Sequence, residues 1–351
     1  MTGPGDLGPP ELPGSEPAAS SESSTLAAQP AASRPGLRTF SLEGRRAPGL
    51  YLVGWLASLV GASTIFVVIV GQPSDLAGAI LLGLGTLLLT TGLAAAAGSQ
   101  AIERLAAGSL GYRGPSPFIL FGATVALTLF IELLAFVPLR ALGVRAGSTV
   151  EALSGLLILN GSAILLVALL VVGSGALSWR EMGVPGRAPA GGSTFAGPLR
   201  DLVAGMFLGV PILFLTALLG AVLIALLGVT PAGPLPTAQT PADAALNLVS
   251  GVLIAPLGEE LFYRGFATTA WVRGMGPRAG IARGALLFAL AHVLTLSGTP
   301  PAALIAFVTR LPVALALGWI FVRRGSLASS FGLHAMFNAI PLILVGLSVG
   351  G

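Results

Sequence analysis

Long apolar segments occupy most of this sequence after residue 50. They lie at residues 50–70, 76–98, 117–139, 153–177, 202–228, 244–266, 281–298, 302–322 and 326–349. Each is close to the ~20 residues that an α-helix needs to cross the hydrocarbon core of a bilayer. Lipid offers no water to hydrogen-bond with backbone amides, so a segment that crosses the membrane must pair them internally. The segments also lack the alternation of apolar and polar residues that is typical of membrane barrel strands. The sequence therefore predicts an all-α integral membrane protein, a bundle of nine transmembrane helices, with eight as the main alternative.

The composition agrees with a chain whose main partner is the lipid bilayer. Hydrophobic residues make up 54% and charged residues 9% of the sequence, against roughly 25% charged residues in soluble domains. The absence of cysteine excludes disulfides, thiolate metal sites and a cysteine nucleophile. The net charge is +4, but the 18 basic residues, all arginines, are scattered at segment ends rather than on one face. We therefore expect no nucleic-acid partner.

Three regions follow from the distribution of apolar residues. Residues 1–47 are rich in Pro, Ser, Ala, Gly and Glu, which cannot bury enough surface to order a chain, so we expect a disordered N-terminal tail. The tail lacks the basic start and short apolar core of a secretory signal peptide. Residues 48–235 form a first set of transmembrane helices, and residues 236–351 form a second set that carries the polar motifs described below.

The arginines predict an orientation in the membrane. With nine helices and a cytoplasmic tail, fourteen arginines fall on the cytoplasmic side, and only Arg140 and Arg145 fall outside. The segments around Gln72, Pro234 and Gly298 carry no arginine, as expected of translocated loops. The bacterial-looking composition then predicts a bacterial cytoplasmic membrane with the N-terminus in the cytoplasm.

Ionisable residues inside a membrane are costly and mark functional sites. Glu259 and Glu260 are adjacent carboxylates in an apolar segment, and Arg264 follows Glu260 by four residues. This spacing predicts an ion pair between Glu260 and Arg264 on one helical face, with Glu259 turned about 100° away toward a cavity. Pro256 and Gly258 just before them can loosen the helix.

Both histidines of the chain lie inside predicted helices of the second set. Phe288 precedes His292 by four residues and Asn338 follows His334 by four, so each pair shares a face. Distances counted at ~1.5 Å per residue from the predicted helix ends place Glu259 and both histidines at ~10–14 Å from one membrane surface. We therefore expect them to meet.

Three motifs give a specific resemblance to a known family. They are Glu259-Glu260-x-x-x-Arg264, Phe288-x-x-x-His292 and His334-x-x-x-Asn338, which occur in this order on separate helices. Together they resemble the CPBP family of intramembrane proteases, which includes type II CAAX prenyl endopeptidases and proteins of bacteriocin processing and self-immunity. The resemblance covers roughly residues 240–345.

The resemblance implies a role for each motif residue. Glu259 and His292 would activate the attacking water, with Glu259 as the base, and His334 and Asn338 would stabilise the oxyanion. Glu260 and Arg264 would fix the helix and its electrostatics. Glu259, His292 and His334 would also suit a divalent metal ion such as zinc, with an open position for water. A glutamate mechanism without metal fits the same residues.

Two other charged residues lie within the predicted helices. Glu132 and Arg310 are interpreted as a buried ion pair or as side chains reaching an interface, with a role in holding substrate as the alternative. Asn160 and Asn247 are interpreted as interhelical hydrogen-bond partners.

The leading hypothesis is an intramembrane endopeptidase that cleaves a peptide or membrane-protein substrate. The rival is a non-catalytic membrane protein that binds a partner, as a bacteriocin self-immunity protein would. A proton-coupled transporter is a third interpretation, because buried Glu and His also suit proton relays. The sequence identifies neither the substrate nor the oligomeric state.

Overall fold

A computed structural model describes residues 41–108, 111–184, 196–294 and 299–350 of the chain. The predicted disordered tail, residues 1–47, lies outside these residues except for its last seven. All helices described here belong to one compact unit, Leu42–Gly351. No β-strand occurs in the described ranges, which confirms the predicted all-α fold.

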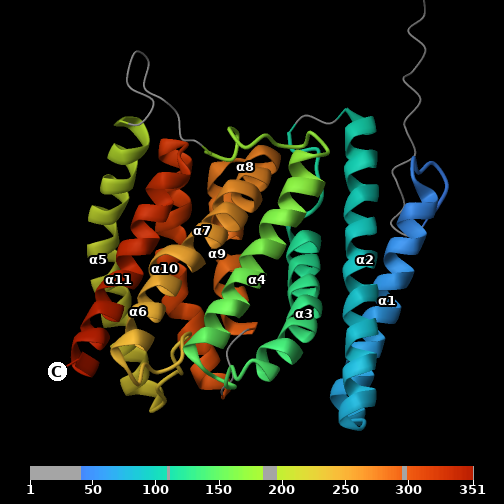
Figure 1. The fold of residues 1–351 in the computed structure, drawn as a ribbon. Coiled ribbons are helices and arrows are strands. Elements are labelled where there is room, and N and C mark those ends of the chain that lie inside the picture. Colours follow the sequence, from blue (N-terminus) through green and yellow to red (C-terminus); the bar gives the residue numbers. More distant parts are fainter. Residues whose placement is uncertain (1–40, 109–110, 185–195, 295–298, 351) are drawn as a thin grey trace, which may run out of the picture. The chain divides into compact units, whose positions relative to one another are not determined.

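The chain folds into helices that follow one another with short connections (Figure 1). Their bounds are α1 Pro48–Gly71, α2 Asp75–Ala107, α3 Pro117–Ala141, α4 Thr149–Val167, η1 Ala168–Val172, α5 Ala196–Leu227, α6 Pro241–Val249, η2 Ser250–Ile254, α7 Ala255–Glu259, η3 Glu260–Thr268, α8 Thr269–Met275, α9 Pro277–Leu294, α10 Pro300–Arg324 and α11 Leu327–Gly350, where η marks π-helical turns. Within the described residues, eight continuous helical segments are long and apolar enough to cross a membrane. The protein is therefore an integral membrane protein.

The predicted segment 281–298 is the one that is not among these eight. It forms α9, which begins earlier than predicted, at Pro277, and so includes Arg278 and Arg283 near its start. α9 packs against η3, α8 and α10, inside the bundle (Figure 1). Eight helices of the described residues are thus long and apolar enough to cross a membrane, and α9 is a further helix of the bundle, with Leu286 and Leu290 about half exposed.

Ion pairs tie the arginine-bearing helix ends to one another. Pairs form between Arg45 and Glu103 (2.9 Å), Arg273 and Glu181 (2.8 Å), and Arg324 and Asp201 (2.7 Å). They connect the start of α1 with the end of α2, the end of α8 with the loop after α4, and the end of α10 with the start of α5. These arginines therefore lie at the same end of the bundle, as the loop analysis predicted. The compartment that this end faces stays a prediction.

The sixth apolar segment is one helix with two widened regions. The segment Pro241–Met275 runs continuously, but η2 and η3 are π-helical on either side of α7. Pro256 lacks an amide N–H, which disturbs the regular ladder as the sequence suggested. In η3, the Thr268 hydroxyl donates to the Tyr263 carbonyl five residues earlier (2.8 Å), satisfying a backbone group of the widened turn.

Small residues allow close helix contacts in two places. A Cβ at Gly54, Gly61 or Gly92 would lie less than 3.0 Å from the facing backbone of the α1–α2 pair. The same is true of Gly205 and Gly332 between α5 and α11. Because lipid provides no hydrophobic drive for helix association, such close backbone packing is a main source of attraction in membranes.

Candidate active site

The motif residues come from three helical segments that meet inside the bundle. Glu259 ends α7 and Glu260 begins η3, while α9 supplies His292 and α11 supplies His334. The Phe288 ring lies between these segments, 4.4 Å from the His292 ring and 5.8 Å from the His334 ring between centroids. Residues that are up to 75 positions apart in the sequence therefore form one site. The expected meeting of Glu259 with both histidines is observed.

The predicted distances from the membrane surface need a correction. The sequence predicted that the helix of Glu259 ends at Phe266. The helix instead continues through η3, which ends at Thr268, and α8 to Met275. Glu259 therefore lies ~24 Å from this helix end at 1.5 Å per residue, rather than ~10 Å. The three groups meet because the helices tilt and pack, not because their sequence spacings agree.

Glu260 and Arg264 form the ion pair that their spacing predicted. Their side chains are 2.9 Å apart, with 0% and 1% of their surfaces exposed. The Arg264 guanidinium also lies 4.2 Å from the centre of the Phe288 ring, where an aromatic face favours a cation. Removing one partner of such a buried pair leaves an uncompensated charge. The contact of Arg264 with the Phe288 ring joins η3 to α9.

Glu260 has a second partner that the sequence did not predict. The Nδ1 atom of His334 lies 2.8 Å from the Glu260 carboxylate oxygen that also binds Arg264. This contact joins η3 to α11 and orients the imidazole. No spacing rule could have found it, because 74 residues separate the two side chains.

Glu259 faces both histidines without bonding to either. Its Oε2 atom lies 3.9 Å from Nε2 of His292 and 3.9 Å from Nε2 of His334. This oxygen is buried and has no hydrogen-bond partner in the described part of the chain. An unsatisfied buried carboxylate oxygen is costly in native proteins. Oε2 of Glu260 is unpartnered among the described residues as well, but Oε2 of Glu259 is the one that faces two imidazole nitrogens, which makes it the candidate position for a water or a substrate atom.

In each histidine, the hydrogen-bond partner of Nδ1 determines which ring nitrogen carries the hydrogen. Nδ1 of His292 lies 2.9 Å from the Phe288 carbonyl, an acceptor only, so Nδ1 carries the hydrogen. The Glu260 carboxylate does the same for His334. In neutral imidazoles the Nε2 atoms are then acceptors. Three acceptors therefore converge, and a single water has hydrogens for only two of them.

The site thus calls for an additional proton or cation. One imidazole can take up a proton, or a divalent cation can bind between the three groups. As they stand, no three His, Cys, Asp or Glu side chains of the described residues lie close enough to hold a metal ion. The donor chemistry nevertheless suits one, because the Glu260 contact to His334 is the type that orients metal-bound imidazoles.

Two asparagine side chains donate hydrogen bonds to backbone carbonyls of η2. Asn338 donates to the Gly251 carbonyl (2.7 Å), and Asn160 donates to the Ile254 carbonyl. Asn160 is thereby an interhelical partner, as predicted, and it packs where Gly258 leaves room. Asn247 donates to the Pro236 carbonyl (2.8 Å) within the preceding loop instead of to another helix. The contact with Gly251 uses one of the two hydrogens of the Asn338 amide, and its role at an oxyanion stays a prediction.

The other two membrane charges do not pair with each other. In the described ranges neither Glu132 nor Arg310 forms an ion pair, so the predicted Glu132–Arg310 pair is wrong. Glu132 lies beside Gly155 of α4. Arg310 is partly buried in α10.

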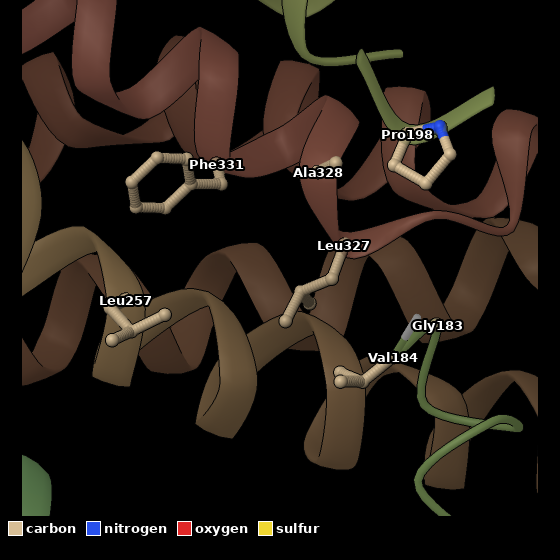
Figure 2. Close-up of a pocket in the computed structure, with 7 residues that line it drawn as sticks. All are labelled: Gly183, Val184, Pro198, Leu257, Leu327, Ala328 and Phe331. Carbon is tan, nitrogen blue, oxygen red and sulfur yellow. The ribbon is translucent and has the colours of Figure 1, made fainter. Parts of the chain in front are cut away.

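An apolar cavity of about 210 Å³ lies near the arginine-rich end of the bundle (Figure 2). Figure 2 shows its seven lining residues: Gly183, Val184, Pro198, Leu257, Leu327, Ala328 and Phe331. Leu257 precedes Glu259 by two residues, and Phe331 precedes His334 by three. The cavity therefore uses the same two helices, α7 and α11, that position the polar site.

Comparison with protein families gives a match in this region. Residues 241–340 match the Rce1-like family, described as type II CAAX prenyl endopeptidase Rce1-like. This part of the chain is therefore similar to that family. The match covers α6 through most of α11 and includes all seven named motif residues, which confirms the resemblance predicted from them. Comparison with curated proteins and with solved structures gave no match.

Proposed function

We propose that this protein is an intramembrane endopeptidase that hydrolyses a peptide bond with a water activated by Glu259. The observation that carries the proposal is the buried, unpartnered Oε2 of Glu259, with two imidazole nitrogens at 3.9 Å. A general base needs an unoccupied proton acceptor beside the water that it activates, and neighbouring groups that position this water. The Rce1-like match of residues 241–340 supports the same reaction class.

The reaction follows from these groups. Glu259 takes a proton from the water, whose oxygen attacks the carbonyl carbon of the peptide. A C–O bond forms, and the carbonyl π electrons move to its oxygen and make an oxyanion. The C–N bond then breaks, and the proton held by Glu259 passes to the leaving amine. His292 keeps the water in line, with its Nδ1–H fixed on the Phe288 carbonyl.

Glu260, Arg264 and His334 act as a unit in this proposal. Arg264 neutralises Glu260, and Glu260 holds the His334 ring so that Nε2 faces the water position. The resemblance implies that His334 stabilises the negatively charged reaction intermediate, and its Nε2 atom faces the water position beside Glu259.

A divalent metal ion, for example zinc, stays a prediction for this site. Glu259, His292 and His334 would be its ligands, through one oxygen and two Nε2 atoms. When bound, it would lower the pKa of a coordinated water and polarise the substrate carbonyl. Metal analysis of the purified wild-type and His292→Ala proteins would check this, with equal metal content in both contradicting it.

The apolar cavity supports a substrate with a hydrophobic segment. Its lining lacks charged residues, and it opens beside the helices that carry Glu259 and His334. A lipid-exposed or lipid-modified part of a membrane-bound peptide fits such a surface, because it exchanges one apolar environment for another. We therefore propose a substrate that is held at the membrane rather than a soluble polar peptide.

The decisive experiment compares peptide termini in membranes that contain wild-type or Glu259→Ala protein at equal levels. We expect new termini that require Glu259, because its loss removes the base. An identical set of termini in the two membranes would contradict the proposal and favour the non-catalytic hypothesis.

A further inference from the structure

The helix that carries Glu259 is widened just before this residue. At the end of η2 the amide of Ala255 donates to the Ser250 carbonyl five residues earlier, one residue more than in an α-helix. Because successive residues of an α-helix are turned by about 100°, one extra residue in a turn rotates the later side chains by roughly that angle. The direction in which Glu259 points therefore depends on η2 staying widened.

Pro256 leaves this widened turn short of one hydrogen bond. In the same five-residue pattern the next amide would belong to Pro256 and would bind the Gly251 carbonyl, but proline has no N–H. Asn338 of α11 supplies a donor in its place, with Nδ2 2.7 Å from the Gly251 oxygen. A side chain from a neighbouring helix thus stabilises a π-helical turn, a conformation that is rare in proteins.

Asn160 of α4 holds the other end of η2. Its side-chain amide donates to the carbonyl of Ile254, the last residue of the widened turn. The same side chain lies against Gly258, where an added Cβ would be less than 3.0 Å from three atoms of the Asn160 side chain. Asn160 and Gly258 are both buried, and Ile254 and Gly258 share one face of the helix because four residues separate them. Asn160 therefore fixes the rotation of α7 directly beside Glu259.

We propose that Asn160 is a positioning residue for the reaction, which keeps Glu259 turned toward the two histidines. This inference rests on the proposed endopeptidase function. Oε2 of Glu259 lies 3.9 Å from each Nε2 atom, and a misplacement of ~1 Å in an active site can cost ~10²-fold in rate. Asn160 lies outside residues 241–340, which match the Rce1-like family. The assignment therefore gives the first set of helices a part in the geometry of the site.

The test uses full-length protein in lipid nanodiscs and a synthetic peptide that spans a Glu259-dependent cleavage site. Asn160→Ala removes the donor to the Ile254 carbonyl and should lower kcat by ~10–10²-fold with little change in KM. Asn247→Ala is the matched control. Asn247 is also buried and also donates to a backbone carbonyl, but its partner is Pro236 in the preceding loop. Its kcat per folded molecule should stay near the wild-type value.

A second substitution perturbs the same contact from the other side. Gly258→Ala places a Cβ in the space of the Asn160 side chain, so it should also lower kcat, and it decides the matter if Asn160→Ala does not fold. In a Glu259→Gln background, Asn160→Ala should lower the residual cleavage no further, because it acts through Glu259. A purely structural role would reduce the residual cleavage as well.

Three results would overturn the proposal. Unchanged kcat in Asn160→Ala, or in Gly258→Ala if only that variant folds, would do so and leave the endopeptidase function intact. Equal losses per folded molecule in Asn160→Ala and Asn247→Ala would also do so, because the effect would then be general destabilisation. A wild-type protein with no more cleavage than Glu259→Gln would overturn both the function and this inference.

Discussion

The α1–α2 pair and the helices of residues 241–350 differ in how their helices pack against one another. In α1, 17% of the most apolar window is buried, whereas in α10 the value is 50%. α1 packs against α2 through glycine and serine and makes no other large helix contact. The later helices instead enclose Glu260, Arg264 and His334, which hold one another through hydrogen bonds.

This difference indicates which part of a membrane helix bundle can hold a catalytic site. Close backbone contact joins two helices mainly through small residues, but it leaves no room for a substrate. A charged network joins helices only if a surrounding shell keeps lipid away from it, because unsatisfied polar groups are costly there. Glu260, Arg264 and His334 therefore lie where several helices overlap, beside α9.

Glu259→Gln should give the largest effect on activity. The change preserves size and hydrogen bonding but removes the base, so cleavage should fall by at least ~10²-fold. Melting of the solubilised protein should change little, because Oε2 of Glu259 has no partner to lose in the described part of the protein. Cleavage assays and melting curves on the same preparations check this. Near wild-type cleavage would show that another group is the base.

Glu260→Gln should give the largest effect on stability. It leaves Arg264 buried without a counter-charge and weakens the hold on His334, so we expect a loss of about 3–5 kcal/mol. Denaturant or thermal unfolding in detergent measures it. Exchange of the two residues, Glu260→Arg with Arg264→Glu, should restore little, because the new arginine would face His334. Full recovery would mean that the His334 contact contributes nothing.

Gly61→Ala tests the other region. The added Cβ would lie 2.4 Å from the Leu89 amide nitrogen of α2, and such overpacking costs roughly 1–3 kcal/mol. Gly71→Ala in the same helix meets nothing within 4 Å and is the control. We expect lower thermal stability for Gly61→Ala alone, with cleavage unaffected at permissive temperature. Equal loss of cleavage would show that the α1–α2 pair supports the site.

The smallest effect concerns pH and the Glu181–Arg273 pair at the bundle end. Hydrogen bonds from Ser178 and Arg273 lower the pKa of Glu181 from 4.5 to about 2. A depressed pKa contributes stability above pH ~4.5 that is lost as the pH falls toward 2. Because the pair is largely exposed, Glu181→Gln should cost less than ~1 kcal/mol at pH 7, and the cost should disappear as the pH falls below 2. Melting curves of the wild-type and Glu181→Gln proteins across this pH range measure the difference.

The sequence anticipated the contacts that lie within one helix. The spacing of Glu260 and Arg264 predicted their ion pair, and the pairing of Phe288 with His292 predicted their shared face. It did not anticipate the His334–Glu260 bond or the use of the Asn338 amide by Gly251. The ion pair considered for Glu132 and Arg310 is absent from the described residues. Both are charges inside apolar segments, but spacing along the sequence carries no information about contacts between helices.

The amino-acid sequence by itself determined the all-helical membrane fold, since only helices satisfy the backbone within segments this apolar. It also determined which residues bear charge inside the membrane, and the Rce1-like match confirms the motif region. The tertiary structure alone decided that Oε2 of Glu259 is left unsatisfied between two imidazoles, and that α9 packs against η3, α8 and α10. The physical reason is that helical periodicity fixes neighbours at three and four residues, whereas contacts between helices depend on tilt, widened turns and small residues that only packing reveals.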